Sequence, residues 1–527
     1  MDLHGRSFIG WASGTDGGKT FTAINPATAQ PIAPNYISAS AAEVERAAQL
    51  AAQAFISFSR TSGKERAVFL REIANRLDGI VDELVIRTNQ EAGLAEARIR
   101  SEAARTAFQM RLFADLIEEG SWVRARLDKG DADRKPAKPD LRSMWRPLGP
   151  VVVFGASNFP LAYSVAGGDT ASAFAAGNPV IVKAHPAHPG TSELVGAVII
   201  AAARACGMPE GIFSLLFDAG TEVGSALVKH PLVRAVGFTG SQRGGRALMN
   251  LAAARPAPIP VFAEMGSTNP VFILPGALAA RGEQIAEGLH GSVTLGAGQF
   301  CTKPGMVFLP KGKDATNFSQ NLSKRIGESA SQVMLTPGIQ SAYTGMVGAR
   351  AKQSKVSLAA EGKPSAGEVG VRGVPAMFAV EAADFLDEPD LSEEVFGPTT
   401  LLVSYGTREE MLEIARGLQG HLTATLHGTD EDLREYRELV EILEQKAGRL
   451  VFNGFPTGVE VGHAIVHGGP YPATSDGQST SVGSQAIYRF ARPVCYQNFP
   501  GAALPDELKD ANPLGIWRLK DGALTKD

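Results

Sequence analysis

The chain has 527 residues, more than three times the roughly 150 of a typical domain, which excludes a single small module. Apolar residues make up 44% and charged residues 20%, values of a folded globular protein and not of a disordered chain. The net charge of −4 argues against nucleic acid as the main partner. Three cysteines are too few for a disulfide framework or a four-cysteine zinc site, and we expect no metal.

The first 20 residues contain no basic segment followed by an apolar core. The longest apolar run, near 194–203, is too short to cross a membrane. We therefore expect a cytoplasmic protein that binds no membrane.

The predicted elements begin with helices over 41–120, where apolar side chains recur every three or four positions. A charged, proline-bearing stretch over about 128–150 is interpreted as a linker or an exposed arm. After it, short apolar strands alternate with helices, which predicts a parallel, helix-covered sheet with ligands at the carboxyl ends of its strands. A second alternating unit begins near 260, and the aromatic and β-branched tail from about 483 is suited to adding an edge strand to a partner.

Two residues are candidates for catalysis. Cys301 follows small residues in GAGQFCT, which would let a substrate and backbone amides approach the sulfur. The alternative is a small buried apolar residue, as we expect for Cys206. Glu264 ends an apolar strand in PVFAEMG, where burial would raise its pKa and suit it to act as a general base. The alternative is a carboxylate that faces solvent or caps a loop.

Three further positions follow predicted strands. Asn158, in SNFPL, is either a donor to an oxyanion or a helix N-cap. Gly240 and Ser241, in FTGS, form a turn before a helix that suits a phosphate, although no GxGxxG motif is present and glycine bends are common. Lys183 ends the strand PVIVK and reaches either a ribose or solvent.

The ordered motifs SNFPL, PVIVKA, GFTGS, EMG, GQFC and EEVFGP together resemble the NAD(P)-dependent aldehyde dehydrogenase superfamily over about residues 20–500. The resemblance implies an α/β fold of three parts. They are a Rossmann-like cofactor domain (1–127 and 148–259), an α/β catalytic domain (260–483) and a small β oligomerisation arm (128–147 and 484–510). It also implies a homodimer or homotetramer.

The resemblance assigns a role to each candidate. Cys301 becomes the nucleophile, Glu264 the base, and Asn158 with the Cys301 backbone N–H the oxyanion hole. By the same resemblance, Lys183 would bind the adenosine ribose, and Gly240 and Ser241 would bind the pyrophosphate. Glu394 would bind the nicotinamide ribose, and Phe396 would lie against the nicotinamide ring. Phe159 and Tyr163 would line the aldehyde tunnel.

Three departures from the family pattern refine these expectations. EMGSTNP has Ser267 and Thr268 where the family has Gly and Lys. Pro186 replaces the acidic residue that holds the ribose 2′-hydroxyl, so we expect NADP, with NAD also accepted. The segments HGGPYPATSDGQSTSVG and RPVCYQNFP are similar to the branch of α-ketoglutaric semialdehyde (2,5-dioxopentanoate) dehydrogenases.

The expected reaction is oxidation of an aldehyde to an acid. The Cys301 thiol, ionised near the cofactor, attacks the aldehyde, and after hydride transfer Glu264 activates water to hydrolyse the thioester. With the semialdehyde as substrate, Arg105 would hold its carboxylate. Arg105 lies seven residues after Arg98 on one helix face, and the plainer interpretation is two solvated arginines.

Four alternatives remain open. Within the same enzyme class, the substrate could be a fatty or other aldehyde, or the thioester could pass to coenzyme A instead of water. Outside that class, the protein could be a cysteine hydrolase that uses no nicotinamide, or an inactive structural relative. None of the nine histidines lies in a recognisable Cys–His motif, which argues against the hydrolase.

Overall fold

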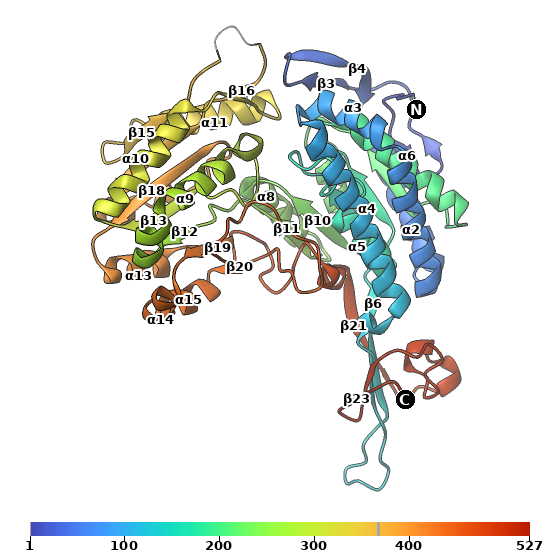
Figure 1. Ribbon diagram of the computed structural model, residues 1–527. Coiled ribbons are helices and arrows are strands. Elements are labelled where there is room, and N and C mark those ends of the chain that lie inside the picture. Colours follow the sequence, from blue (N-terminus) through green and yellow to red (C-terminus); the bar gives the residue numbers. More distant parts are fainter. Residues whose placement is uncertain (1, 366–368) are drawn as a thin grey trace.

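The computed structural model describes residues 2–365 and 369–527. Two α/β lobes lie side by side, and a narrow β arm projects away from them and carries the C-terminus (Figure 1). The predicted α/β class is confirmed. In the described part of the chain, no helix is both long and apolar enough to span a membrane.

The first lobe is built on a seven-stranded sheet in the order β11-β10-β7-β8-β9-β1-β2. The five strands from β11 to β9 run parallel, and β1 and β2 form an antiparallel edge. The strands are β1 (Phe8–Ile9), β2 (Ala12–Ser13), β7 (Val151–Phe154), β8 (Val180–Lys183), β9 (Phe213–Leu216), β10 (Ala235–Thr239) and β11 (Val261–Glu264).

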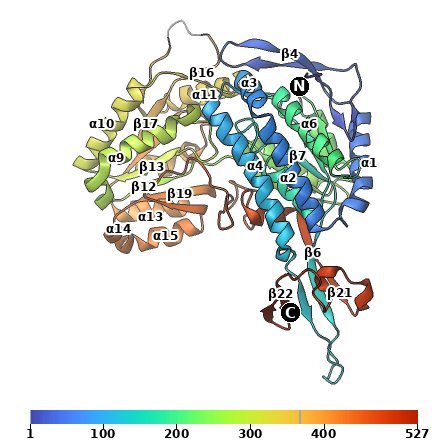
Figure 2. The same cartoon turned by 45° about the vertical axis from the view of Figure 1, so that its right-hand side comes forward.

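Helices cover both faces of this sheet because its strands are apolar on both sides. Val151 and Val153 of β7 pack into the core formed with α2 to α6, whereas Val152 packs against α1 and α7. Figure 2 shows the layer formed by α2, α4 and α6. The helices are α1 (Ala41–Phe58), α2 (Gly63–Gly79), α3 (Val81–Ala92), α4 (Glu96–Glu119), α5 (Gly168–Ala176), α6 (Pro189–Ala205), α7 (Glu222–Lys229) and α8 (Gln242–Ala253).

One strand lies in a different sheet from the one predicted. The sequence pattern put the start of the second unit near residue 260, ahead of the strand that carries Glu264. That strand, β11, instead pairs in parallel with β10 at the edge of the first sheet. A pattern of alternating elements shows where a strand lies in the chain but does not show which neighbour it pairs with, and the chain crosses between lobes only after Glu264.

The second lobe has the sheet β15-β17-β18-β13-β12-β19-β20, parallel except for β15. Its strands are β12 (Val271–Ile273), β13 (Met306–Pro310), β15 (Ser357–Glu361), β17 (Ala376–Glu381), β18 (Thr399–Tyr405), β19 (His421–His427) and β20 (Ala447–Phe452). Its faces are covered by α9 (Pro275–Thr294) and α10 (Lys313–Glu328) on one side and by α12 (Ala382–Asp387), α13 (Arg408–Gly417) and α15 (Arg437–Glu444) on the other.

The arm is a five-stranded sheet in the order β21-β6-β5-β22-β23. The predicted tail strand pairs antiparallel with the charged stretch, as β21 (Ala491–Gln497) against β6 (Leu141–Pro147). The sheet also takes in β5 (Arg126–Asp128), β22 (Arg518–Lys520) and β23 (Ala523–Thr525), so its strands reach beyond the predicted 128–147 and 484–510.

Candidate active site

The candidate residues converge at the carboxyl ends of the first sheet's strands. Asn158 follows β7, Gly240 and Ser241 follow β10, and Glu264 is the last residue of β11. In this sheet β8 and β9 lie on one side of β7, and β10 and β11 lie on the other, so the strand order reverses at β7. Open α/β sheets bind ligands beyond the carboxyl ends of the strands at such a reversal. Cys301 comes to the same place from the second lobe, after α9 and before β13.

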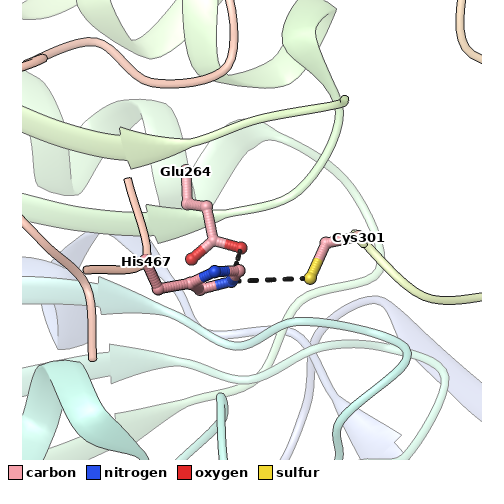
Figure 3. A group of neighbouring side chains, drawn as sticks. All are labelled: Glu264, Cys301 and His467. Atoms are coloured by element: carbon pink, nitrogen blue, oxygen red, sulfur yellow. Dashed lines mark hydrogen bonds and ion pairs between the residues drawn. The ribbon is translucent and has the colours of Figure 1, made fainter. Parts of the chain in front are cut away.

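Cys301, Glu264 and His467 form one cluster (Figure 3). The Cys301 Sγ lies 3.6 Å from the Nε2 of His467, and the same nitrogen lies 3.0 Å from the Glu264 Oε1. The His467 side chain is fully buried, and the Glu264 side chain is 2% exposed. A nucleophile, an imidazole and a carboxylate within reach of one another are the groups that proton transfer at sulfur requires.

The predicted direction of the Glu264 pKa shift is wrong. Burial does favour the neutral acid, but His467 and a hydrogen bond from the Ser481 Oγ, 2.5 Å from the Glu264 Oε2, outweigh it. With the positive charge of Arg489 nearby, these contacts lower the pKa of Glu264 below its ordinary value. The carboxylate is therefore charged at neutral pH.

The Cys301 thiol has the opposite tendency. Burial, together with the negative charges of Glu264 and Glu394, raises the pKa of Cys301 well above its ordinary value. The resting sulfur is thus a neutral thiol, and it must lose its proton to react.

His467 is the site residue that the sequence analysis missed. It lies 166 residues after Cys301, on the long segment between β20 and the 3₁₀ helix Ser484–Phe490. Its backbone N–H donates to the Thr480 hydroxyl, and its carbonyl accepts from the backbone and the hydroxyl of Ser481. The absence of a recognisable Cys–His motif therefore does not mean that the thiol lacks a histidine neighbour.

A cavity of about 300 Å³ brings most of the predicted cofactor residues together. Ser241 caps α8, with its hydroxyl 3.2 Å from the Gly244 backbone N–H, so the helix N-terminus faces this region. A Cβ on Gly266 would lie 2.2 Å from the Glu394 Oε2, so the glycine leaves room for that carboxylate in the cavity. The cavity is lined by Ser157, Asn158, Thr239, Gly240, Ser241, Glu264, Met265, Gly266, Cys301, Ile339, Ala342, Tyr343, Met346, Glu394 and Phe396.

This set of groups fits a dinucleotide. A helix N-terminus binds phosphate, a carboxylate binds ribose hydroxyls, and the aromatic Phe396 and apolar Ile339 and Met346 suit flat rings. Burial raises the pKa of Glu394 to about 7, although the positive charge of Lys303 acts in the opposite direction and lowers it.

Lys183 lies outside the residues that line this cavity. Its Nζ donates to the backbone carbonyl of Asp218 at 2.7 Å, and burial lowers its pKa to about 8. His188, further along the same segment, is fully buried, and its ring Nε2 forms a hydrogen bond with the Ala156 carbonyl. Burial lowers the pKa of both His185 and His188, so neither adds positive charge beside Pro186.

Asn158 lies beside Cys301 but does not cap a helix. The helix after β7, α5, begins only at Gly168. The Asn158 Nδ2 donates to the Gln299 backbone carbonyl at 3.1 Å, and the Asn158 backbone carbonyl accepts from the Arg98 guanidinium at 2.7 Å. The Gln299 carbonyl thus holds the side-chain amide in the wall of the cavity that Cys301 also lines, where an oxyanion donor is needed.

A second cavity, of about 460 Å³, opens on the other side of Cys301. Among the described residues, Cys301 alone lines both cavities. The second is lined by Arg98, Ser101, Glu102, Arg105, Phe159, Tyr163, Leu295, Phe300, Cys301, Thr302, Gly458, Val459 and Glu460. The rings of Phe159, Tyr163 and Phe300 form an edge-to-face aromatic wall.

Two arginines of α4 face this second cavity. The Arg98 guanidinium lies 4.5 Å from the Phe300 ring centre, and Arg105 donates to the Val459 carbonyl and lies 3.4 Å from the Tyr163 hydroxyl. The expected alternative of two solvated arginines therefore does not hold. A cavity with an aromatic wall and two guanidinium groups suits a small ligand that carries an anionic end.

Fold and site together define an α/β enzyme with a cysteine between two ligand cavities. The chain belongs to the aldehyde dehydrogenase family, whose sequence profile matches residues 11–477. The resemblance noted in the sequence is thereby confirmed.

The chain is also similar to individual proteins of that family. It is 49% identical to alpha-ketoglutaric semialdehyde dehydrogenase 2 of Azospirillum brasilense and 44% identical to alpha-ketoglutaric semialdehyde dehydrogenase of Acinetobacter baylyi. Each match covers 99% of both chains. The solved structure of an indole-3-acetaldehyde dehydrogenase complexed with NAD⁺ has the same fold, with a TM-score of 0.81, 22% identity, and coverage of 94% of this chain and 97% of that one.

Proposed function

We propose that the protein oxidises α-ketoglutaric semialdehyde to 2-oxoglutarate with NADP. The observation that carries the proposal is the position of Cys301 between a dinucleotide-type cavity and a cavity with two guanidinium groups. The names of the relatives at 49% and 44% identity favour the same substrate.

In the proposed reaction, the Cys301 sulfur attacks the aldehyde carbon, and the Asn158 amide and the Cys301 backbone N–H stabilise the oxyanion. When bound, the oxidised nicotinamide cofactor supplies the hydride acceptor. Water then hydrolyses the thioester, and the Glu264 carboxylate, buried beside the sulfur, takes the proton of that water. The acid leaves, and the thiol is restored.

The residues divide between the two ligands in this proposal. Glu394, Phe396, Gly240 and Ser241 hold the cofactor, with Lys183 at the adenosine end. Phe159 and Tyr163 form the wall beside the aldehyde chain, and Arg105 binds the distal carboxylate. The arm would join subunits in a homodimer or homotetramer, because the open edge of β21 is able to pair with another strand.

The test is a panel of aldehydes, each assayed with NADP and with NAD by the absorbance of the reduced cofactor. We expect the five-carbon semialdehyde acid with NADP to have the highest kcat/KM. We expect Cys301→Ala to lose turnover while it still binds NADP. A clear preference for long uncharged aldehydes, or measurable turnover by Cys301→Ala, would contradict the proposal.

A further inference from the structure

The buried imidazole beside Cys301 has no role in the reaction as described so far. We propose that His467 is the group that takes the proton from the Cys301 thiol as the sulfur attacks the aldehyde. This inference rests on the proposed function. In the step, the S–H bond breaks and the proton moves to the His467 Nε2. The sulfur electron pair forms the S–C bond, and the carbonyl electron pair moves to oxygen.

The position of the His467 ring supports this role. Its Nε2 lies 3.6 Å from the sulfur, the reach of a hydrogen bond to sulfur, and the ring packs edge to face against Tyr163. In the described part of the chain, the Nδ1 has no hydrogen-bond partner although the side chain is fully buried. Burying a polar ring without pairing both nitrogens is unfavourable, and a structural role would be served better by an apolar side chain.

Glu264 is placed to stabilise the product of the proton transfer. Its Oε1 lies 3.0 Å from the His467 Nε2, and among the described residues it has no hydrogen-bond donor otherwise. The Nε2–H formed by the transfer therefore lies next to this carboxylate oxygen, whose negative charge stabilises the imidazolium. The other oxygen of Glu264 already accepts from Ser481.

Several charged or titratable groups surround the transfer, and each influences it. Tyr163 faces the ring from the segment after β7, Cys301 from the loop after α9, and Glu264 from β11. Three more distant charges also act on these groups. Glu394 and Arg449 act on the Cys301 sulfur, and Arg489 acts on Glu264. Within this set, Glu264 is the competing proton acceptor, and the experiment must separate it from His467.

The experiment measures the rate at which iodoacetamide alkylates Cys301 in the cofactor-free enzyme from pH 5.5 to 9.5. Peptide mass spectrometry separates Cys301 from Cys206 and Cys495. We expect His467→Gln to lower the rate at pH 7 by at least about tenfold and to move the pH of half-maximal rate upward. Glu264→Gln, which retains the imidazole but loses the carboxylate that stabilises the imidazolium, should lower the rate by less than His467→Gln does, since the proton acceptor is intact.

His463→Gln is the matched control. His463 lies four residues earlier on the same segment and contacts Ser484, and its variant should behave as the wild type. An unchanged profile in His467→Gln, or a loss in Glu264→Gln as large as in His467→Gln, would overturn the inference. Because neither aldehyde nor cofactor is present, this result is independent of whether the proposed substrate is correct.

A second measurement guards against a folding defect in the variant. In His467→Ala, added imidazoles of increasing basicity should restore alkylation of Cys301, and the rate should rise with the pKa of the added base. A residue that only supports the fold would not give this dependence. Absence of rescue, in a variant whose circular dichroism and thermal unfolding match the wild type, would also overturn the inference.

Discussion

Lys303 connects the segment of Cys301 to the segment of Glu394, because its Nζ donates to the carbonyl of Val395 at 3.0 Å. A second bond reaches the carbonyl of Thr399 at 2.8 Å. Lys303 is two residues after Cys301, and Val395 is the residue after Glu394. The ammonium therefore fixes one side of the proposed cofactor cavity to the loop that carries the sulfur, and its charge acts on Glu394.

Cofactor binding should depend on pH through Glu394. Its pKa of about 7 means that the carboxyl is largely neutral at pH 6 and largely charged at pH 8. A charged carboxylate accepts ribose hydroxyl bonds more strongly, so NADP binding should be up to about tenfold weaker at pH 6 than at pH 8. Calorimetric titration of NADP at both pH values measures this.

Two variants test the origin of this pH dependence. In Glu394→Gln, the part of the pH dependence that comes from the carboxyl should disappear. In Lys303→Met, the loss of the opposing positive charge should move the midpoint to higher pH. If Glu394→Gln retains the full dependence, another group is responsible.

Replacing Glu264 with Gln should slow thioester hydrolysis more than hydride transfer. The amide cannot take the proton of water, and loss of a general base typically costs about 10² to 10⁴ in rate. Rapid mixing with the semialdehyde should therefore give a burst of reduced cofactor followed by slow turnover. If the burst vanishes along with the steady state, Glu264 is required before hydrolysis.

The cofactor preference should respond to Pro186. A carboxylate there would repel a 2′-phosphate, so Pro186→Glu should lower kcat/KM with NADP by roughly tenfold or more relative to NAD. Pro186→Ala is the control for loss of the ring alone. An unchanged NADP-to-NAD ratio in Pro186→Glu would show that the 2′-phosphate lies elsewhere.

Arg105→Ala should affect acidic substrates selectively. Loss of a charged hydrogen bond to a carboxylate should raise the KM for the semialdehyde acid by roughly 10- to 100-fold, with little change for an uncharged aldehyde of equal length. Arg100→Ala is the control, since Arg100 is on α4 but pairs with Glu96 and Asp82 at the surface. Equal effects on both aldehydes would assign Arg105 to structural support of Val459.

Much of the architecture was predictable because it depends on the pattern of apolar and polar residues within short segments. Continuous apolar strands such as Val151–Phe154 require cover on both faces, so helices on both sides of the sheet follow directly. The strand-end positions of Asn158, Gly240 and Glu264 likewise follow from short motifs next to each strand. Parallel strands bring such ends to one edge, whatever their order in the sheet.

The properties that the sequence did not reveal depend on contacts between distant segments. His467 lies on a segment without regular secondary structure, where no periodicity points to a ligand or a partner. The low pKa of Glu264 depends on that histidine and on Ser481, which is 217 residues away in the chain. Burial alone, the one property a strand end suggests, gave the wrong direction.

The location of Cys301 in the wall between two cavities also bears on chemical inhibition. An electrophile with an acidic group would reach the sulfur from the side of Arg98 and Arg105. A flat aromatic electrophile would reach it from the side of Phe396 and Tyr343. Two chemically unrelated series of covalent inhibitors can therefore be designed against the Cys301 sulfur. The proposed aldehyde substrate should protect the enzyme from the first series, and the proposed cofactor should protect it from the second.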